Sequence, residues 1–98
     1  MPVSQYPQHS SVTLPNADKV LYKLSKHFAL KVPVEFDDSN SRVQFPAGNC
    51  EIQREGDLLR LQCSADSKEK LAQVIRIVDH HLALMARNPE LRISWTDA

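Results

Sequence analysis

Apolar and polar residues alternate through the middle of this chain, and this pattern restricts the possible folds more than any other feature. Four runs show the alternation, at residues 32–36, 42–45, 50–53 and 58–63. Turn-forming residues lie between the runs, at 37–40, 46–48 and 56–57. Successive side chains of a strand point to opposite faces of a sheet. The pattern therefore predicts four consecutive antiparallel strands with one buried and one solvated face.

Two amphipathic helices and two further strands flank this central region. The first helix is predicted over residues 17–30, with Asn16 as its N-cap. The second is predicted over 67–87, where Asp66 has capping-box spacing to Glu69. Short alternating runs predict further strands at 11–14 and 91–96.

The predicted order of elements is β-α-β-β-β-β-α-β. This is an α+β fold, in which an antiparallel sheet carries two helices packed on one face. The 98 residues suit one domain. We expect a single α+β domain over residues 11–98, preceded by a flexible N-terminal tail at residues 1–10.

Charge and composition argue against several functional classes. Twelve basic residues balance twelve acidic ones, so no net field draws the chain towards nucleic acid or an anionic membrane. No segment resembles a secretory signal or a membrane span. Two cysteines without a signal segment predict reduced thiols and a cytoplasmic location. Two glycines are too few for a Gly-rich phosphate loop.

The predicted open face of the sheet does not suit nucleic acid. A platform for single strands needs aromatic rings on that face, whereas the alternation points Phe36, Phe45 and Trp95 towards the buried face. We therefore expect a protein partner or a small ligand, with no nucleic acid, no membrane and no cofactor.

Four residues that can bind soft metal ions point towards the predicted core. Cys50 and Cys63 alternate inward, and a two-residue turn at 56–57 sets them directly opposite each other. His81 lies within the apolar arc of the second helix, and His27 lies at the edge of the apolar stripe of the first. The candidate metal ligands are His27, Cys50, Cys63 and His81. Because their spacing lacks a paired CxxC, the interpretation as buried thiols and ordinary helix histidines is favoured.

Two other functions rest on a few residues each. A redox protein or enzyme would use Cys50 as its reactive group, with His27 or His81 as the base. The sequence contains no HExxH, GxSxG or paired-carboxylate pattern in support. An interaction domain would dimerise through Ile77 and Leu84, which widen the apolar arc of the second helix towards the first helix or a second subunit.

Four segments of the chain form a recognisable combination. They are HFALKVPVEF at 27–36, VQFPAGNC at 43–50, His81-Leu82 and Ile93-Ser94-Trp95. Together they resemble the bacterial domain of unknown function 2218 family, over residues 12–95. The chain departs from the family pattern at Leu30, where histidine is frequent, and at Cys63, which the pattern does not require. The resemblance implies a small bacterial protein of undetermined activity, associated with siderophore-interacting flavoproteins as neighbours or fusions.

We therefore hypothesise a non-enzymatic binding or accessory module. A link to iron or siderophore handling rests on the resemblance. No catalytic residue is assigned, and the candidate binding residues are His27, Lys31, Cys50 and His81.

Overall fold

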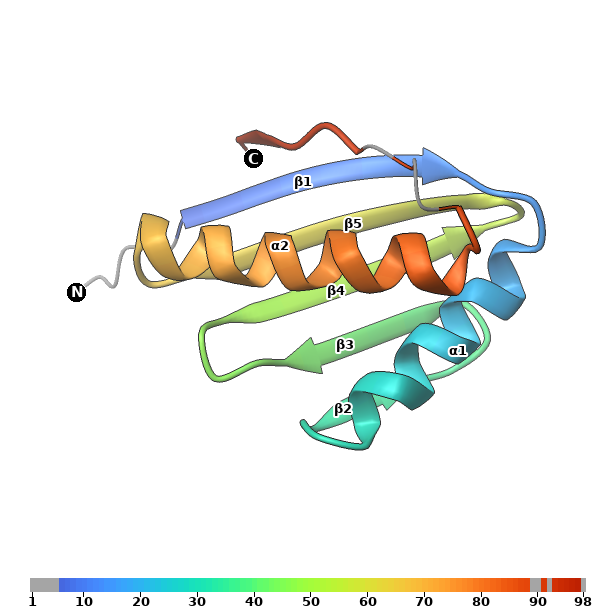
Figure 1. Ribbon diagram of the computed structural model, residues 1–98, viewed down its shortest axis with the longest axis horizontal. Helices are drawn as coiled ribbons and strands as arrows, with labels where there is room; N and C mark the ends of the chain where they lie inside the picture. The colour runs from blue at the N-terminus through green and yellow to red at the C-terminus, as the bar shows by residue number, and fades with distance from the viewer. Residues whose placement is uncertain (1–5, 89–90, 92, 98) are drawn as a thin grey trace.

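An antiparallel sheet forms one layer of the computed structural model, and two helices form the other (Figure 1). The structure describes residues 6–88, 91 and 93–97. Its elements are β1 (Tyr6–Thr13), α1 (Ala17–Ala29), β2 (Val34–Phe36), β3 (Asn40–Gln44), β4 (Asn49–Glu55), β5 (Leu58–Ala65), α2 (Lys68–Met85) and β6 (Thr96–Asp97). The predicted α+β class and element order are confirmed.

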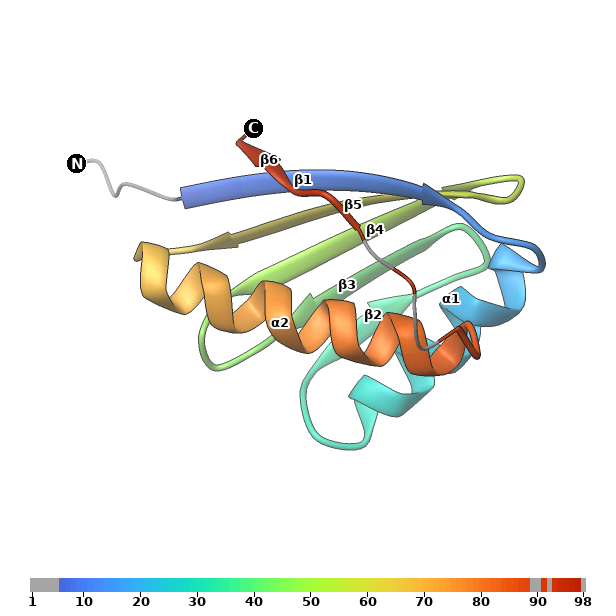
Figure 2. The ribbon, with the colours of Figure 1, turned by 45° about the horizontal axis from the view of Figure 1, so that its top comes forward.

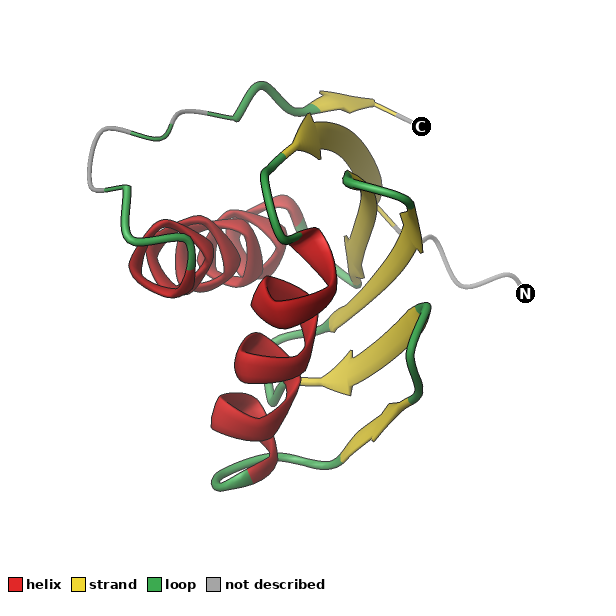
Figure 3. Cartoon of the chain, turned by 90° about the vertical axis from the view of Figure 1, so that its right-hand side faces the viewer, coloured by secondary structure: helices red, strands yellow, loops and turns green. Residues whose placement is uncertain are grey.

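The strands lie side by side in the order β2-β3-β4-β5-β1-β6. β2 to β5 form the predicted meander, and β1 pairs antiparallel with β5 from Tyr6 opposite Ala65 to Thr13 opposite Leu58. Both helices cover the same face of the sheet, as Figure 3 shows. Within the described chain, no helix combines the length and the apolar character that crossing a membrane requires.

Burial confirms the predicted alternation along the meander. Side chains on the helix side are buried at Val43, Cys50, Ile52, Leu59, Leu61 and Cys63. Side chains on the open face are exposed at Glu35, Arg42, Gln44, Glu51, Gln53, Arg60 and Gln62. A slip of one residue would exchange the two faces, so burial of the apolar set fixes the register.

The β4–β5 hairpin has the predicted two-residue turn. Glu55 pairs with Leu58, and the same count places Cys50 opposite Cys63. Gly56, the first turn residue, has a φ of 60°. This left-handed conformation favours glycine, which has no Cβ to clash with the neighbouring carbonyl oxygen.

The predicted N-cap position is confirmed for α1 but not for α2. Asn16 is the N-cap of α1, but its φ is 60° and its side chain makes no capping hydrogen bond. In α2 the N-cap is Ser67, whose Oγ accepts a hydrogen bond from the backbone N–H of Lys70 at 3.2 Å. The prediction that Asp66 caps α2 is therefore wrong. Ser67 adopts the extended conformation of an N-cap, which leaves Asp66 outside the helix and paired with Lys70 at 3.4 Å.

The predicted boundary at residue 11 falls inside β1. Residues 6–10 form the first part of this strand, so the prediction of a tail is wrong for them. β5 continues to Ala65, and its outer edge would otherwise expose unpaired backbone groups. Pairing with β5 along that edge stabilises residues 6–10 as a strand although most of them are polar. Residues 1–5 of the predicted tail lie outside the described residues.

The last predicted strand is shorter and later than expected. β6 contains only Thr96–Asp97, which pair with His9 and Gln8 of β1. Leu91, Ile93 and Trp95 are half-buried against the core, so their alternation reflects packing and not strand pairing. Figure 2 shows residues 93–97 running to the edge of β1. Arg92, part of the same prediction, lies outside the described residues.

Candidate functional site

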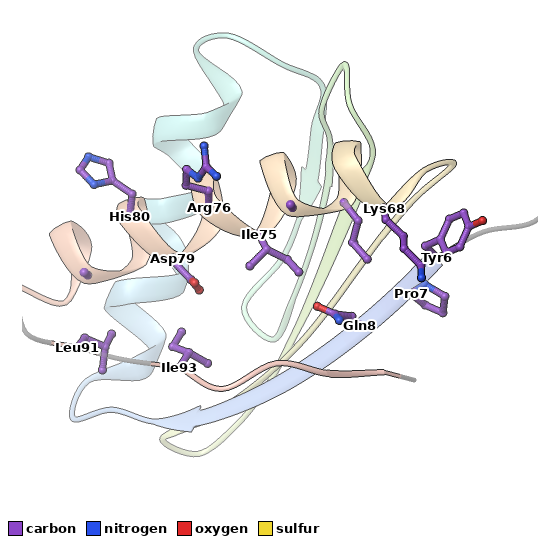
Figure 4. A pocket seen from close by; sticks show the side chains of 13 residues that line it. Tyr6, Pro7, Gln8, Lys68, Ile75, Arg76, Asp79, His80, Leu91 and Ile93 are labelled. Carbon is purple, nitrogen blue, oxygen red and sulfur yellow. The ribbon is translucent and has the colours of Figure 1, made fainter.

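A groove of about 1000 Å³ runs beside α2, between this helix, the start of β1 and the residues that follow α2 (Figure 4). We call it the α2 groove. Its apolar lining consists of Pro7, Leu71, Ala72, Ile75, Ala83, Leu91 and Ile93. Its polar lining consists of Tyr6, Gln8, Lys68, Arg76, Asp79 and His80.

One side of α2 forms the first wall of the groove. Ala72, Ile75, Asp79 and Ala83 recur at intervals of three and four residues, which places them along one side of the helix. Ile75 and Asp79 point towards β1 and Ile93 (Figure 4). Because Ala72 and Ala83 are small, the helix leaves space on this side for another molecule.

Ile93, the first residue of the C-terminal segment (residues 93–97), lies in the opposite wall. Trp95 Nε1 donates a hydrogen bond to Asp79 Oδ1 at 2.9 Å, which ties the segment to α2. Ser10 Oγ donates to the carbonyl oxygen of Ser94 at 2.6 Å, which ties it to β1. Together with the β1–β6 pairing, these contacts hold Ile93 on the groove.

Cationic side chains lie at one end and along the rim. Lys68 begins α2, and its side chain extends towards Tyr6 and Pro7 (Figure 4). Arg76 is exposed on the rim. Neither Lys68 nor Arg76 forms an ion pair with another described residue. Both cations are therefore available to an anionic group of a ligand.

Asp79 is the acidic group of the groove. It is half-buried, and burial raises the pKa of its carboxyl above the ordinary value of 3.8, an effect that the hydrogen bond from Trp95 opposes. Oδ1 is engaged by the indole, so Oδ2 is the oxygen that can meet a polar group of a ligand.

The two predicted histidines meet at the junction of α1 and α2. The ring centres of His27 and His81 lie 4.9 Å apart, and the ring of Phe28 lies 5.2 Å from that of His81. His81 Nδ1 lies 2.8 Å from the carbonyl oxygen of Ile77. A carbonyl can only accept, so Nδ1 carries a proton and donates it to this oxygen.

The two cysteines form a second pair, beneath the helices. Both thiols are fully buried, and the residues are direct partners in β4 and β5. A hydrogen bond with Cys63, then burial, raises the pKa of the Cys50 thiol well above 9.0. Since the thiolate is the catalytic nucleophile and the metal ligand, this arrangement does not support Cys50 as the nucleophile of an enzyme or as a metal ligand at neutral pH.

The four predicted metal ligands thus occupy two pairs. Within the described chain, no group of three or more histidine, cysteine, aspartate or glutamate side chains is placed to hold a metal ion. The fifth candidate, Lys31, is exposed just beyond α1. The α2 groove is lined by none of the sequence-predicted site residues, His27, Lys31, Cys50, Cys63 and His81.

The residues of the α2 groove were not identified from the sequence. The spacing of Ala72, Ile75, Asp79 and Ala83 is a visible signal, because small residues on one side of a helix allow close approach. Nothing in the local pattern shows that the C-terminal segment lies opposite them, since the hydrogen bond between Trp95 and Asp79 joins residues 16 positions apart.

The chain is similar to a bacterial protein family and to a solved bacterial structure. The family described as "Uncharacterized protein conserved in bacteria (DUF2218)" matches residues 9–96. The chain is also similar to the NMR structure of PA4090 from Pseudomonas aeruginosa, with 26% identity and a TM-score of 0.79 over 93% of this chain and 95% of that chain. No curated protein is significantly similar in sequence.

Proposed function

This chain belongs to the bacterial DUF2218 family, and from that premise we propose that it is a non-enzymatic binding module whose α2 groove takes a small organic anion. The observation that carries the proposal is the groove itself, about 1000 Å³ in volume, whose lining combines seven apolar residues with six polar ones. This combination is typical of small-molecule sites in proteins.

The lining defines the class of ligand. Leu71, Ile75 and Ile93 would cover an apolar body, and each buried CH₂ group contributes about 0.8 kcal/mol. Lys68 would bind a carboxylate or similar anion at the end of the groove. Asp79 would meet a hydrogen-bond donor, or donate from its own carboxyl when protonated.

Binding is favoured over catalysis by the state of the cysteines. The alternative redox or metal-dependent enzyme would use Cys50 with His27 or His81. The Cys50 thiol is buried, and its raised pKa keeps it protonated. The described lining of the groove holds one carboxyl, two cations and His80, but no serine, threonine or cysteine that could act as a nucleophile.

The resemblance to proteins associated with siderophore-interacting flavoproteins adds a specific ligand class to this proposal. A siderophore is an iron chelator with an organic body, and several chemical types carry carboxylates. Calorimetric titration with a carboxylate siderophore, in its ferric and its metal-free form, tests the link to iron handling. Heat of binding that is lost in the Lys68→Gln variant supports it, whereas the absence of heat for both forms removes the link and leaves the wider proposal to the next experiment.

The direct test uses Trp95, the only tryptophan of the chain, which contacts the groove wall through Asp79. Decanoate is the anionic probe and decanol its neutral counterpart. We expect decanoate to change Trp95 fluorescence saturably and to bind more tightly than decanol. Lys68→Gln should weaken decanoate binding about tenfold, since a hydrogen bond to a charged group contributes about 1.5 kcal/mol.

Lys31→Gln is the matched control, because Lys31 is an exposed lysine outside the groove. The control variant should bind decanoate as the unmodified protein does. Equal loss in both variants, or equal affinity for decanoate and decanol, would show that Lys68 does not select an anion in the groove.

A dimerising interaction domain is the second candidate, and exposed apolar side chains favour it. Leu84 of α2 is 55% exposed and Leu30, just beyond α1, is 80% exposed. Ile77, the other residue predicted at this surface, is half-buried against the core. Light scattering of the purified protein would decide the question. A dimer that Leu84→Ser converts to a monomer would support this function, and a monomer at all concentrations would oppose it.

A further inference from the structure

The Cys50–Cys63 pair is independent of the α2 groove, and the proposed binding function does not use it. The backbone N–H of Arg54 donates to the carbonyl oxygen of Ser39 at 2.7 Å, on the β3 side of β4. Residues of a strand that are an even number apart direct their N–H groups to the same neighbour. Cys50, four residues before Arg54, therefore directs its N–H towards β3 and away from β5.

Cys50 and Cys63 are consequently a non-hydrogen-bonded pair of β4 and β5. In such a pair the Cα atoms lie about 4.5 Å apart and the side chains approach most closely. Disulfides span Cα separations of about 4.4–6.8 Å. A hydrogen bond with Cys63 is the largest cause of the raised pKa of Cys50, as expected when their sulfur atoms face each other.

The apolar surroundings of the pair favour a disulfide over a complex with a metal ion. Val43, Ile52 and Leu61 occupy neighbouring positions on the same face of the sheet as the pair, and all three are buried. Two thiolates binding a monovalent metal ion would leave a net negative charge in this apolar layer, which is strongly unfavourable. A disulfide is neutral and apolar, so it preserves the chemistry of the core.

One strand separates the pair from the α2 groove. Gln8 of β1 is the direct neighbour of Cys63 across the β1–β5 ladder. Gln8 is half-buried and, with Leu71, lines the α2 groove. A small uncharged molecule in the groove is therefore one strand away from the Cys63 thiol.

We propose that Cys50 and Cys63 are a modification site, at which hydrogen peroxide oxidises a buried dithiol to a cross-strand disulfide. The Cys63 sulfur attacks one peroxide oxygen, giving a sulfenic acid and one molecule of water. The Cys50 sulfur then attacks the Cys63 sulfur, the S–S bond forms, and the hydroxyl group leaves as a second water with the Cys50 proton. The two thiols lose two electrons and two protons, and the peroxide is reduced to two waters.

The test follows thiols in the folded protein. The protein is incubated with hydrogen peroxide, the peroxide is removed with catalase, and the chain is unfolded in guanidinium with N-ethylmaleimide before mass spectrometry. We expect a chain that has lost two hydrogen atoms and carries no maleimide. Treatment with a reductant should restore two maleimide-reactive thiols, and circular dichroism should show that the oxidised chain remains folded.

Cys50→Ala and Cys63→Ala are matched controls, because each leaves one thiol in the same layer. Neither variant can form a disulfide within the chain, so neither should show the mass loss of two hydrogen atoms alone. If an alanine variant does not fold, peptide mapping of the unmodified chain identifies the Cys50–Cys63 link directly. Glutathione is the positive control and should be fully oxidised over the same long incubation. If the folded chain treated under those conditions still carries two maleimides, the proposal is overturned. Disulfides found only between chains, or only after unfolding, would overturn it as well.

Discussion

Ser67 and Asp66 are neighbours with different roles at the start of α2. Ser67 Oγ satisfies the backbone N–H of Lys70, whereas Asp66 forms an exposed ion pair with the Lys70 side chain. Loss of an N-cap costs about 1 kcal/mol, and loss of an exposed ion pair costs about 0.3 kcal/mol. We therefore expect Ser67→Ala to lower the free energy of unfolding more than Asp66→Ala does, as measured by urea denaturation. The reverse order would assign the cap to Asp66.

Asp79 should make stability depend on pH in an unusual direction. Its native pKa is raised above 3.8 by burial, so the native state binds this proton more tightly than the unfolded chain does. The resulting stabilisation is fully present below pH 3.8 and is lost as pH rises through the native pKa. Asp79→Asn removes this titration but keeps an oxygen that can accept from Trp95. As pH rises from 3.8 through the native pKa of Asp79, the free energy of unfolding of the unmodified protein should fall relative to that of the variant.

Asp37 provides the control of opposite sign. Backbone hydrogen bonds from Ser39 and Asn40 lower the pKa of its carboxyl below 3.8. Its stabilisation should be present above pH 3.8 and lost as pH falls through the native pKa, and Asp37→Asn should abolish that dependence. Urea denaturation at a series of pH values would measure both variants. The same direction of change in both would contradict the assigned causes.

Some single-residue features were predictable and others were not. The opposition of Cys50 and Cys63 followed from the turn at 56–57, because a two-residue turn fixes every later pair by counting. The choice between Asp66 and Ser67 as cap could not be made locally, since both residue types are good N-caps. The backbone conformation of Ser67 decides it.

Some secondary-structure elements were likewise predictable from the sequence, and others were not. The meander from β2 to β5 could be predicted because its strands pair with sequence neighbours, and the alternation also gives the buried face. β1 and β6 were predicted less well, since β1 pairs Tyr6 with Ala65, far along the chain, and β6 pairs with β1 across almost its whole length. An alternating pattern reports which side chains are buried, but not whether the backbone is paired.

The two glycines of the meander should differ in their sensitivity to alanine. A Cβ on Gly48 would contact the backbone carbonyl oxygen of Ser64 and the side chain of Ala65. A Cβ on Gly56 would meet no atom within 4 Å, but its φ of 60° is costly for alanine. We expect Gly48→Ala to destabilise by about 2–3 kcal/mol and Gly56→Ala by about 1 kcal/mol. Guanidinium denaturation would measure both, and a larger loss for Gly56→Ala would show that β4 and β5 can separate locally.

At the scale of the whole molecule, the α2 groove combines three parts of the chain that are remote in sequence. Residues 6–8, one side of α2 between residues 68 and 83, and the pair Leu91 and Ile93 contribute to it. The sequence correctly indicated that His81 and the cysteines point towards the core, but burial alone does not define a site. The groove depends on where the C-terminal segment crosses, which the hydrogen bonds of Trp95 and Ser10 determine. The cytoplasmic location stays a prediction.

The central claim is that the α2 groove is the binding site, and amide chemical shifts of ¹⁵N-labelled protein titrated with decanoate test it most directly. We expect the saturable shift changes to concentrate on Gln8, Lys68, Ile75, Asp79 and Ile93, and to be small on the open face of the sheet. Changes that concentrate instead on the sequence-predicted residues His27, Lys31 and His81, with the groove amides unmoved, would contradict the account.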